Sequence, residues 1–168
     1  MRDTVDDHVE AWAAELPWLD PVKEAILTRM AMVVRHITHT RSGLILDEDL
    51  TLREYKTLVK LRQLGSPWET NPSALAELVG LTRGAMSQRL ARLEGLGFVA
   101  RRQEGADGRR VTVGLTDRGL ETVERLMVEE ERSELSALSG LSPDERQALA
   151  DLLRKVTRSV DDHGPANE

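Results

Sequence analysis

Several features are missing from this 168-residue chain, and each absence narrows its chemistry. Without cysteine, the chain can form no disulfide, thiol-based redox sensor or cysteine-ligated zinc site. No apolar run approaches the ~18 residues of a membrane span. The acidic N-terminus, MRDTVDDHVEAW, lacks the basic and apolar regions of a signal peptide. We therefore expect a soluble cytoplasmic protein without a membrane partner.

Aromatic residues are scarce, at 3% of the chain, so the core must be built from Leu, Val, Ala, Ile and Met. This composition favours helices, and the length suits about one domain. No nucleophile elbow, phosphate loop or HExxH pattern occurs, so we expect no catalysis and no cofactor. His36 and His39 have a metal-compatible spacing but no obvious carboxylate beside them, and we predict no metal site. Glu129, Glu130 and Glu131 indicate a solvated helix face.

The charge is distributed unevenly along the chain. A net charge of −6 by itself argues against binding a polyanion. Residues 81–110, however, hold seven cations and three anions, a net +4, which leaves −10 for the rest. A basic segment in an acidic frame suits a protein that grips nucleic acid with one face. A solvated surface with uneven charge is an equally good interpretation at this point.

The apolar pattern predicts a mainly α-helical chain. Asp20, Thr51 with Glu54, and Ser142 are predicted helix caps, and the second helix is expected to end at Gly43. Thr116 is the predicted cap of a long helix that reaches about residue 138. Together the predicted long helices cover residues 5–16, 21–42, 51–65, 116–138 and 142–160.

Two short helices joined by one tight turn are predicted, one at 71–80 and one from 82 to about Gly95 or Gly97, with Asn71 and Thr82 as caps. The second is rich in Arg, Ser and Gln, and the pair is typical of a helix-turn-helix. The first helix is expected to bury Leu75, Leu78 and Val79.

The second short helix has one apolar face, made of Met86, Leu90 and Leu93. Its opposite, N-terminal surface is small and polar, so its backbone can approach a ligand closely. Gln and Arg can read base edges, and Ser and backbone amides at a helix start suit phosphates. An ordinary amphipathic surface helix is an equally good interpretation of this helix alone. The predicted DNA contacts on this helix are Thr82, Arg83, Gly84, Ser87, Gln88 and Arg92.

A change of period from 3.6 to 2 then predicts a β-hairpin. FVARR and RVTVGLT are short and rich in Val and Thr, and a glycine-containing turn separates them. Arg109 and Arg110 follow the turn directly, and an arginine at such a tip suits the minor groove. Asp107 is close enough to hold that guanidinium, although a solvated hairpin with a local ion pair has the same sequence. Helix-turn-helix followed by a basic hairpin is more specific than either part, and it predicts DNA binding.

LTRGAMSQRLARLEGLGFVARR and DGRRVTVGLTDRG resemble the MarR family of winged-helix transcriptional regulators. The most specific signature is Asp107–x–Arg109 followed by Leu115, Thr116 and Gly119, and the resemblance covers nearly the whole chain. It implies a homodimeric repressor whose wings straddle pseudo-palindromic double-stranded DNA. The long terminal helices agree, because their apolar surface exceeds what one small winged domain needs. Half-sites should lie ~10 bp apart.

The resemblance also implies release from DNA by a small aromatic or anionic ligand. The extra N-terminal helix with Trp12 resembles a urate-responsive subgroup, in which a tryptophan, an aspartate and two arginines serve the pocket. Trp12, Arg89 and Arg101 match three of these positions, but Lys56 stands at the aspartate position. This charge reversal argues against urate itself and suits a different anion. A packing role for Trp12, and salt bridges or phosphate contacts for the arginines, are alternatives.

We therefore expect a mainly α fold with a small β-hairpin wing. Residues 1–50 would serve dimerisation and ligand binding, 51–119 DNA binding and 120–160 dimerisation, with a disordered tail at 161–168. The alternative is a winged helix that binds proteins and not DNA, which the acidic frame alone supports.

Overall fold

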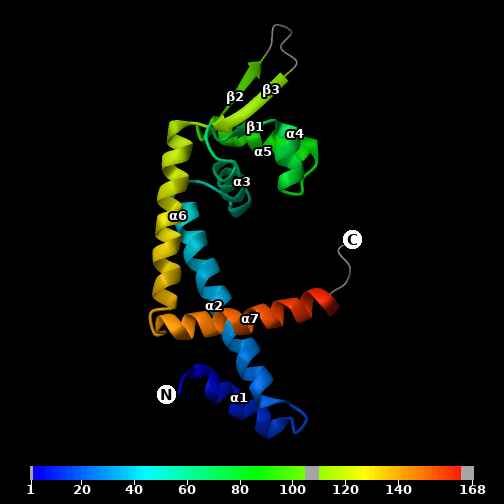
Figure 1. Cartoon of the computed structure of the whole chain (residues 1–168), viewed down its shortest axis with the longest axis vertical. Coiled ribbons are helices and arrows are strands. Elements are labelled where there is room, and N and C mark those ends of the chain that lie inside the picture. Colours follow the sequence, from blue (N-terminus) through cyan, green and yellow to red (C-terminus); the bar gives the residue numbers. More distant parts are fainter. Residues whose placement is uncertain (1, 105–109, 164–168) are drawn as a thin grey trace. The chain divides into compact units, whose positions relative to one another are not determined.

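The computed structural model describes residues 2–104 and 110–163, and the chain forms two compact units, Met1–Glu131 and Arg132–Glu168. Most of its described residues are helical, as predicted (Figure 1). The elements are α1 (Thr4–Glu15), α2 (Pro21–Leu46), α3 (Leu52–Gln63), β1 (Glu69–Thr70), α4 (Pro72–Leu78), α5 (Arg83–Gly95), β2 (Val99–Glu104), β3 (Arg110–Leu115), α6 (Asp117–Ala137) and α7 (Pro143–His163).

Side-chain caps start these helices where the sequence predicts them. Asn71 accepts the Ala74 amide at the start of α4, and Thr82 accepts the Ala85 amide at the start of α5. Each cap satisfies an amide that has no partner within its helix. Further predicted caps confirmed by the structure are Asp20, Thr51 with Glu54, Thr116 and Ser142. Glu145 adds a bond from the Ser142 amide that the sequence analysis did not predict.

The wing is an antiparallel sheet of order β1-β3-β2, in which Arg101 pairs with Val113 across β2 and β3. The predicted hairpin is therefore confirmed, and β1 is an addition that the sequence did not indicate. A strand of two residues is too short to show an alternating pattern. Gly114 allows this pairing, since an added Cβ there would lie 2.9 Å from the Cβ of Glu69.

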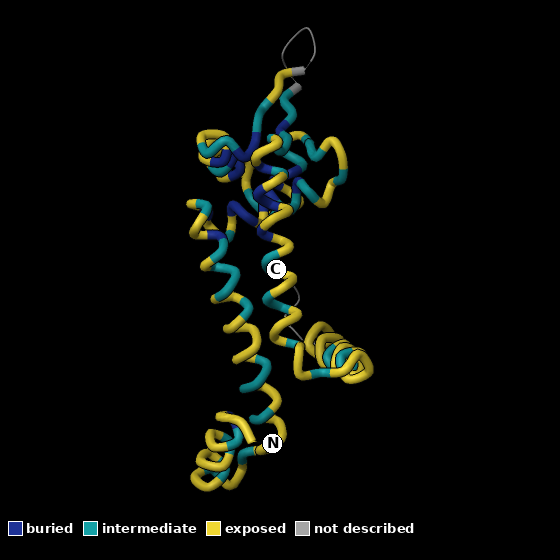
Figure 2. The backbone as a smooth tube through the Cα atoms, turned by 90° about the vertical axis from the view of Figure 1, so that its left-hand side faces the viewer, coloured by how far each residue is buried: buried dark blue, intermediate teal, exposed yellow. Residues whose placement is uncertain are grey.

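One apolar core holds the helix-turn-helix and the wing together, and most of the dark blue segments of Figure 2 belong to it. Met86, Leu90 and Leu93 are fully buried, as predicted, while Leu78 is 47% exposed and does not join them. The prediction for Leu78 was wrong because α4 ends at this residue, and its side chain lines an open pocket instead. The fully buried members from other elements include Leu58, Leu61, Leu75, Phe98 and Val113.

Two predicted helix ends were too early. α2 continues past Gly43 to Leu46, because Ile45 packs into the core and is 1% exposed. α7 continues to His163, beyond the predicted start of the tail at 161. Residues 164–168 lie outside the described part of the chain.

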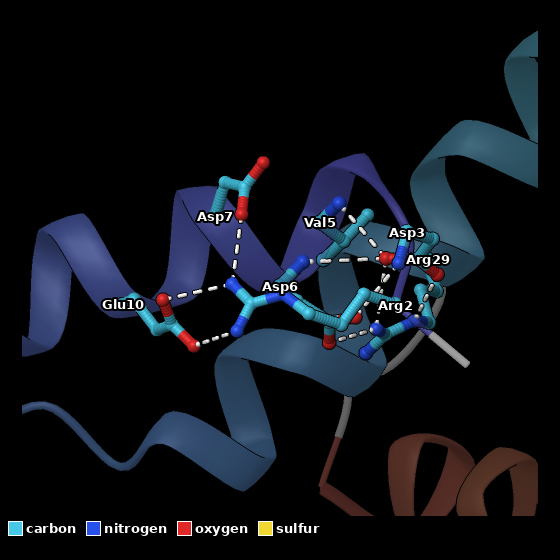
Figure 3. Close-up of polar contacts among 7 residues, drawn as sticks. All are labelled: Arg2, Asp3, Val5, Asp6, Asp7, Glu10 and Arg29. Atoms are coloured by element: carbon cyan, nitrogen blue, oxygen red, sulfur yellow. Dashed lines mark hydrogen bonds and ion pairs between the residues drawn. The ribbon is translucent and has the colours of Figure 1, made fainter.

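An ion-pair cluster attaches α1 to α2 (Figure 3). Arg29 on α2 donates to Asp3 at 2.9 Å and to Asp6 at 2.6 Å, and these aspartates also form the capping box of α1. Hydrogen bonds from Arg29 hold the pKa of the Asp3 carboxyl below its ordinary range. The pKa of the Asp6 carboxyl is lowered first by a bond from the Asp3 amide and then by the bond from Arg29. Ionised aspartates therefore contribute to the docking of α1.

Candidate nucleic-acid interface and neighbouring pocket

The outer face of α5 is the exposed, polar surface that the sequence predicts. Thr82, Arg83, Gly84, Ser87 and Gln88 are all exposed. Gly84 and Gln88 lie opposite the buried apolar face of the helix, and Arg83 and Ser87 flank them toward its N-terminal end. An added Cβ at Gly84 would meet nothing within 4 Å, so this face is open. Arg83 forms no ion pair with the described residues. The helix thus presents amide, hydroxyl and guanidinium groups beside a bare stretch of backbone.

Arg92, the remaining predicted DNA contact of α5, is engaged within the protein. Its Nε lies 2.8 Å from Glu54, whose side chain is 7% exposed, and Nη2 donates to the carbonyl of Asp49 at 2.7 Å. Burial opposes ionisation of Glu54, but bonds from Thr51 and the charge of Arg92 outweigh it and lower the pKa. Arg92, 46% exposed and one helical turn after Gln88, therefore fixes α5 to the start of α3.

Arg101 on β2 joins the wing to α5. Its guanidinium donates to the carbonyl of Ser87 at 2.9 Å, and its Nε lies 3.6 Å from Glu94. Arg102 is exposed, with a nitrogen 3.8 Å from Glu69. These contacts set the hairpin relative to the outer face of α5. Asp107 and Arg109, predicted at the wing tip, lie outside the described residues, while Arg110 opens β3 opposite Glu104.

A pocket of about 570 Å³ lies behind α5 and brings together Lys56 and Arg89, two of the four predicted ligand residues. We call it the α3 pocket. Trp12 and Arg101 do not line it; Trp12 lies on α1, 47% exposed, with its ring centroid 6.3 Å from that of His8. The charged residues that line the α3 pocket are Arg41, Arg53, Lys56, Lys60, Arg89 and Glu130.

Arg89 points toward α3, away from the outer face. Its Nη1 donates to the hydroxyl of Thr57 at 3.0 Å and to the carbonyl of Arg53 at 3.2 Å. Burial lowers the pKa of Arg89, because removing the guanidinium from water disfavours its charged form. The sequence allowed either direction for this side chain, since its position lies between the two faces of α5.

Glu130 on α6 is a site residue that the sequence reasoning missed. Its side chain is 16% exposed and lies 2.9 Å from the Nε of Arg41 on α2, so the prediction of a solvated glutamate face was wrong here. The signal was present: Glu130 follows the buried Leu126 by four residues, which puts both on one helix face. The neighbouring Glu129 and Glu131 made Glu130 resemble part of a solvated acidic face.

Among the described residues, no group of three His, Asp or Glu side chains could hold a metal ion. No helix in the same ranges is long and apolar enough to cross a bilayer.

The fold and the exposed helix face define a winged helix-turn-helix protein, and comparisons supply the family. The MarR family matches residues 50–111, from the residue before Thr51 into β3. PecS, an HTH-type transcriptional regulator of Dickeya dadantii, is 29% identical over 93% of this chain and 94% of its own length. An uncharacterized HTH-type transcriptional regulator of Bacillus cereus is 31% identical over 64% of this chain and 70% of its own.

Solved structures share the fold at lower identity. YusO of Bacillus subtilis has a TM-score of 0.72 at 20% identity, covering 82% of this chain and 95% of that one. A MepR variant of Staphylococcus aureus bound to an oligodeoxyribonucleotide has a TM-score of 0.65 at 22% identity, covering 80% and 97%. MepR has also been solved bound to ethidium bromide.

This chain belongs to the MarR family. It is a DNA-binding transcriptional regulator and not an enzyme.

Proposed function

We propose that the chain is a homodimeric repressor that binds a pseudo-palindromic operator and leaves it when a small anionic ligand binds. The observation that carries this proposal is the outer face of α5, where Arg83, Ser87 and Gln88 are exposed around Gly84. Gln and Arg suit base edges in the major groove, and Ser suits phosphate oxygens. Thr82 would contribute beside them, and Arg109 with Arg110, oriented by Asp107, would enter the minor groove.

Rigid support behind this face favours the same function. Arg92 and Arg89 tie α5 to α3, and Arg101 ties the wing to α5 through Ser87. Sequence reading requires contacts held in a fixed register, since a displaced donor loses its base. We therefore assign Arg92 and Arg101 to positioning the interface.

Unburied apolar side chains support the dimer. On α2, Val22, Ile26 and Val33 are 66%, 50% and 47% exposed. Apolar stripes of this kind mark protein contacts, and a twofold axis is the commonest way to cover them. We propose that residues 1–50 and 120–160 dimerise, while 51–119 bind DNA. On α7 a second stripe consists of Leu149, Leu152, Val156 and Val160.

The α3 pocket supports release by a ligand. It lies directly behind the helix proposed to read DNA, and a molecule that pairs with Arg89 would pull on that helix from its inner side. Resemblance to PecS and the N-terminal helix fit the urate-responsive subgroup, but Lys56 favours an anion other than urate.

Fluorescence anisotropy with DNA from upstream of the chain's own gene tests the proposal at two salt concentrations. Arg83→Ala should weaken binding across sequences and reduce the salt slope by about one counterion. Gln88→Ala should relax the preference at one base position, measured by selection from a random library. Arg132→Ala, at an exposed α6 arginine outside the proposed DNA contacts, is the control, and size-exclusion chromatography must first show that this variant still forms the dimer. Identical affinity, slope and consensus for all three variants and the unmodified chain would contradict the proposal.

A further inference from the structure

Arg62 on α3 connects two parts of the chain outside its own helix. Its Nε donates to the carboxylate of Glu124 on α6 at 2.9 Å, and its Nη2 lies 2.8 Å from the same carboxylate. Its guanidinium carbon lies 5.7 Å from the centre of the Trp68 ring, within the range of a cation–π contact. The pair with Glu124 limits the orientations of the guanidinium, so the flat cation stays against the indole ring. Arg62 therefore links α6 to the residue that precedes β1.

Trp68 is the residue through which the chain enters β1, and its backbone has an unusual conformation. Its φ of 58° lies in the left-handed region, which is unfavourable for a residue with a bulky side chain. Its amide donates to the carbonyl of Gly65 at 2.6 Å, and its carbonyl accepts the amide of Leu115 at 3.2 Å. Such a conformation persists only where surrounding contacts hold it. The Arg62 guanidinium is one of those contacts.

The position of β1 affects the position of the wing. The two residues of β1 pair with Gly114 and Val113 near the end of β3, and β1 lies at the base of the β2–β3 hairpin (Figure 1). Arg110, the first residue of β3, lies about 13 Å from Gly114 at ~3.3 Å per residue. A rotation of about 10° at the base would move that end of the hairpin by about 2 Å, which a hydrogen bond does not tolerate.

Arg101 restrains the opposite edge of the sheet. The strand order β1-β3-β2 places Arg101 on one edge strand and β1 on the other, and Arg101 donates to a backbone carbonyl of α5. Val99 and Val113 pack the sheet on the core, but apolar contacts have no preferred direction. A sheet tied at one edge can rotate about that edge, whereas ties at both edges hold a binding site in register. The contact of Arg62 with Trp68 supplies the second tie.

We propose that Arg62 and Trp68 are positioning residues for DNA binding, which set the angle at which the wing enters the minor groove. The inference rests on the wing contact of the proposed function and goes beyond it, because neither side chain is among the proposed DNA contacts. Loss of the Arg62–Trp68 contact would displace the wing and leave the outer face of α5 unchanged. The expected defect is therefore confined to the minor groove.

Hydroxyl-radical footprinting and fluorescence anisotropy of the full chain, on DNA from upstream of its own gene, test this assignment. Trp68→Ala and Arg62→Gln should lose the minor-groove protection that flanks the half-sites and keep the protection at the half-site centres. Their affinity should fall about tenfold, the effect of one charge-assisted contact, and the salt slope by about one counterion. Trp68→Phe keeps an aromatic face for the guanidinium and should retain more flanking protection than Trp68→Ala.

Arg125→Gln is the matched control. Arg125 also forms ion pairs on α6, with Glu48 and with Glu129 at 3.2 Å, but among the described residues it stacks on no aromatic ring. This variant should keep the protection at both the centres and the flanks. Circular dichroism and size-exclusion chromatography must first show that each variant is folded and dimeric. Arg62→Gln, at a side chain 36% exposed, decides the test if Trp68→Ala does not fold.

Flanking protection that either folded variant keeps would overturn the inference alone, provided that the unmodified chain shows it. An equal loss at centres and flanks would also overturn it, because general destabilisation gives that result. So would a selective loss of the flanks in Arg125→Gln. If the unmodified chain protects the half-site centres without the flanks, the wing contact of the proposed function fails, and the inference fails with it.

Discussion

Gly119 determines how closely the first turn of α6 lies on the chain that enters the wing. An added Cβ would stand 1.9 Å from the carbonyl oxygen of Phe98 and 2.9 Å from its carbonyl carbon. That carbonyl accepts the Thr116 amide at 3.1 Å, and the Phe98 ring is fully buried. Neither group can withdraw without losing contacts, so Gly119→Ala must displace α6 or the wing.

Two effects of opposite sign set the magnitude. Alanine stabilises a free helix by about 1 kcal/mol relative to glycine. Forcing a methyl group into filled space costs about 1–3 kcal/mol, and a 1.9 Å approach to a backbone atom puts this site at the upper end. The clash should therefore win by about 2 kcal/mol, which lowers Tm by about 4–8 °C in a chain of this size.

Thermal unfolding followed by circular dichroism measures the effect, with Gly43→Ala as a matched control. Gly43 lies within α2 and has nothing within 4 Å of an added Cβ, so only the helix preference acts and Tm should rise by about 2–4 °C. A rise in Tm for Gly119→Ala, or a fall for both variants, would refute the reasoning.

Three further outcomes are expected. Arg92→Ala leaves Glu54 buried without its cation and should lower the free energy of unfolding by about 1–2 kcal/mol, measured by urea denaturation. The expected loss is no larger because Arg92 is half-exposed and water screens its charge. An unchanged urea midpoint contradicts this. The lowered pKa values of the two aspartates that contact Arg29 mean that their stabilisation is complete above about pH 4 and is lost as the pH falls through the folded-state values. Tryptophan fluorescence, to which Trp12 on α1 contributes, should report this loosening. Arg29→Ala should reduce that acid-dependent step, and the capping amides would maintain the remainder; an unchanged step contradicts this. Gly84→Ala should keep or slightly raise Tm yet weaken DNA binding, because its methyl group would lie on the outer face; unchanged affinity argues against close backbone approach.

The winged helix-turn-helix could be predicted because each part has a local signal. Asn71 and Thr82 cap their helices through amides three residues away, and the change of period marks the hairpin. β1 could not be predicted, because two residues carry no pattern and pair only through the distant β3.

The roles of the arginines on α5 could not be read from the sequence. Arg83, Arg89 and Arg92 lie within ten residues, yet one is exposed on the outer face, one bonds to Thr57 and one to Glu54. Their partners come from α3, far away in the sequence, so the helix alone cannot distinguish a DNA contact from an internal tie. Glu130 differs, because its helical phase relative to Leu126 already placed it on the inner face of α6.

Hydroxyl-radical footprinting on the upstream DNA of the chain's own gene tests the central claim most directly. A twofold dimer that reads DNA with α5 should protect two half-sites centred ~10 bp apart, and added minor-groove protection should flank them. Protection of a single half-site, or none at protein concentrations where the dimer is fully formed, would contradict the account.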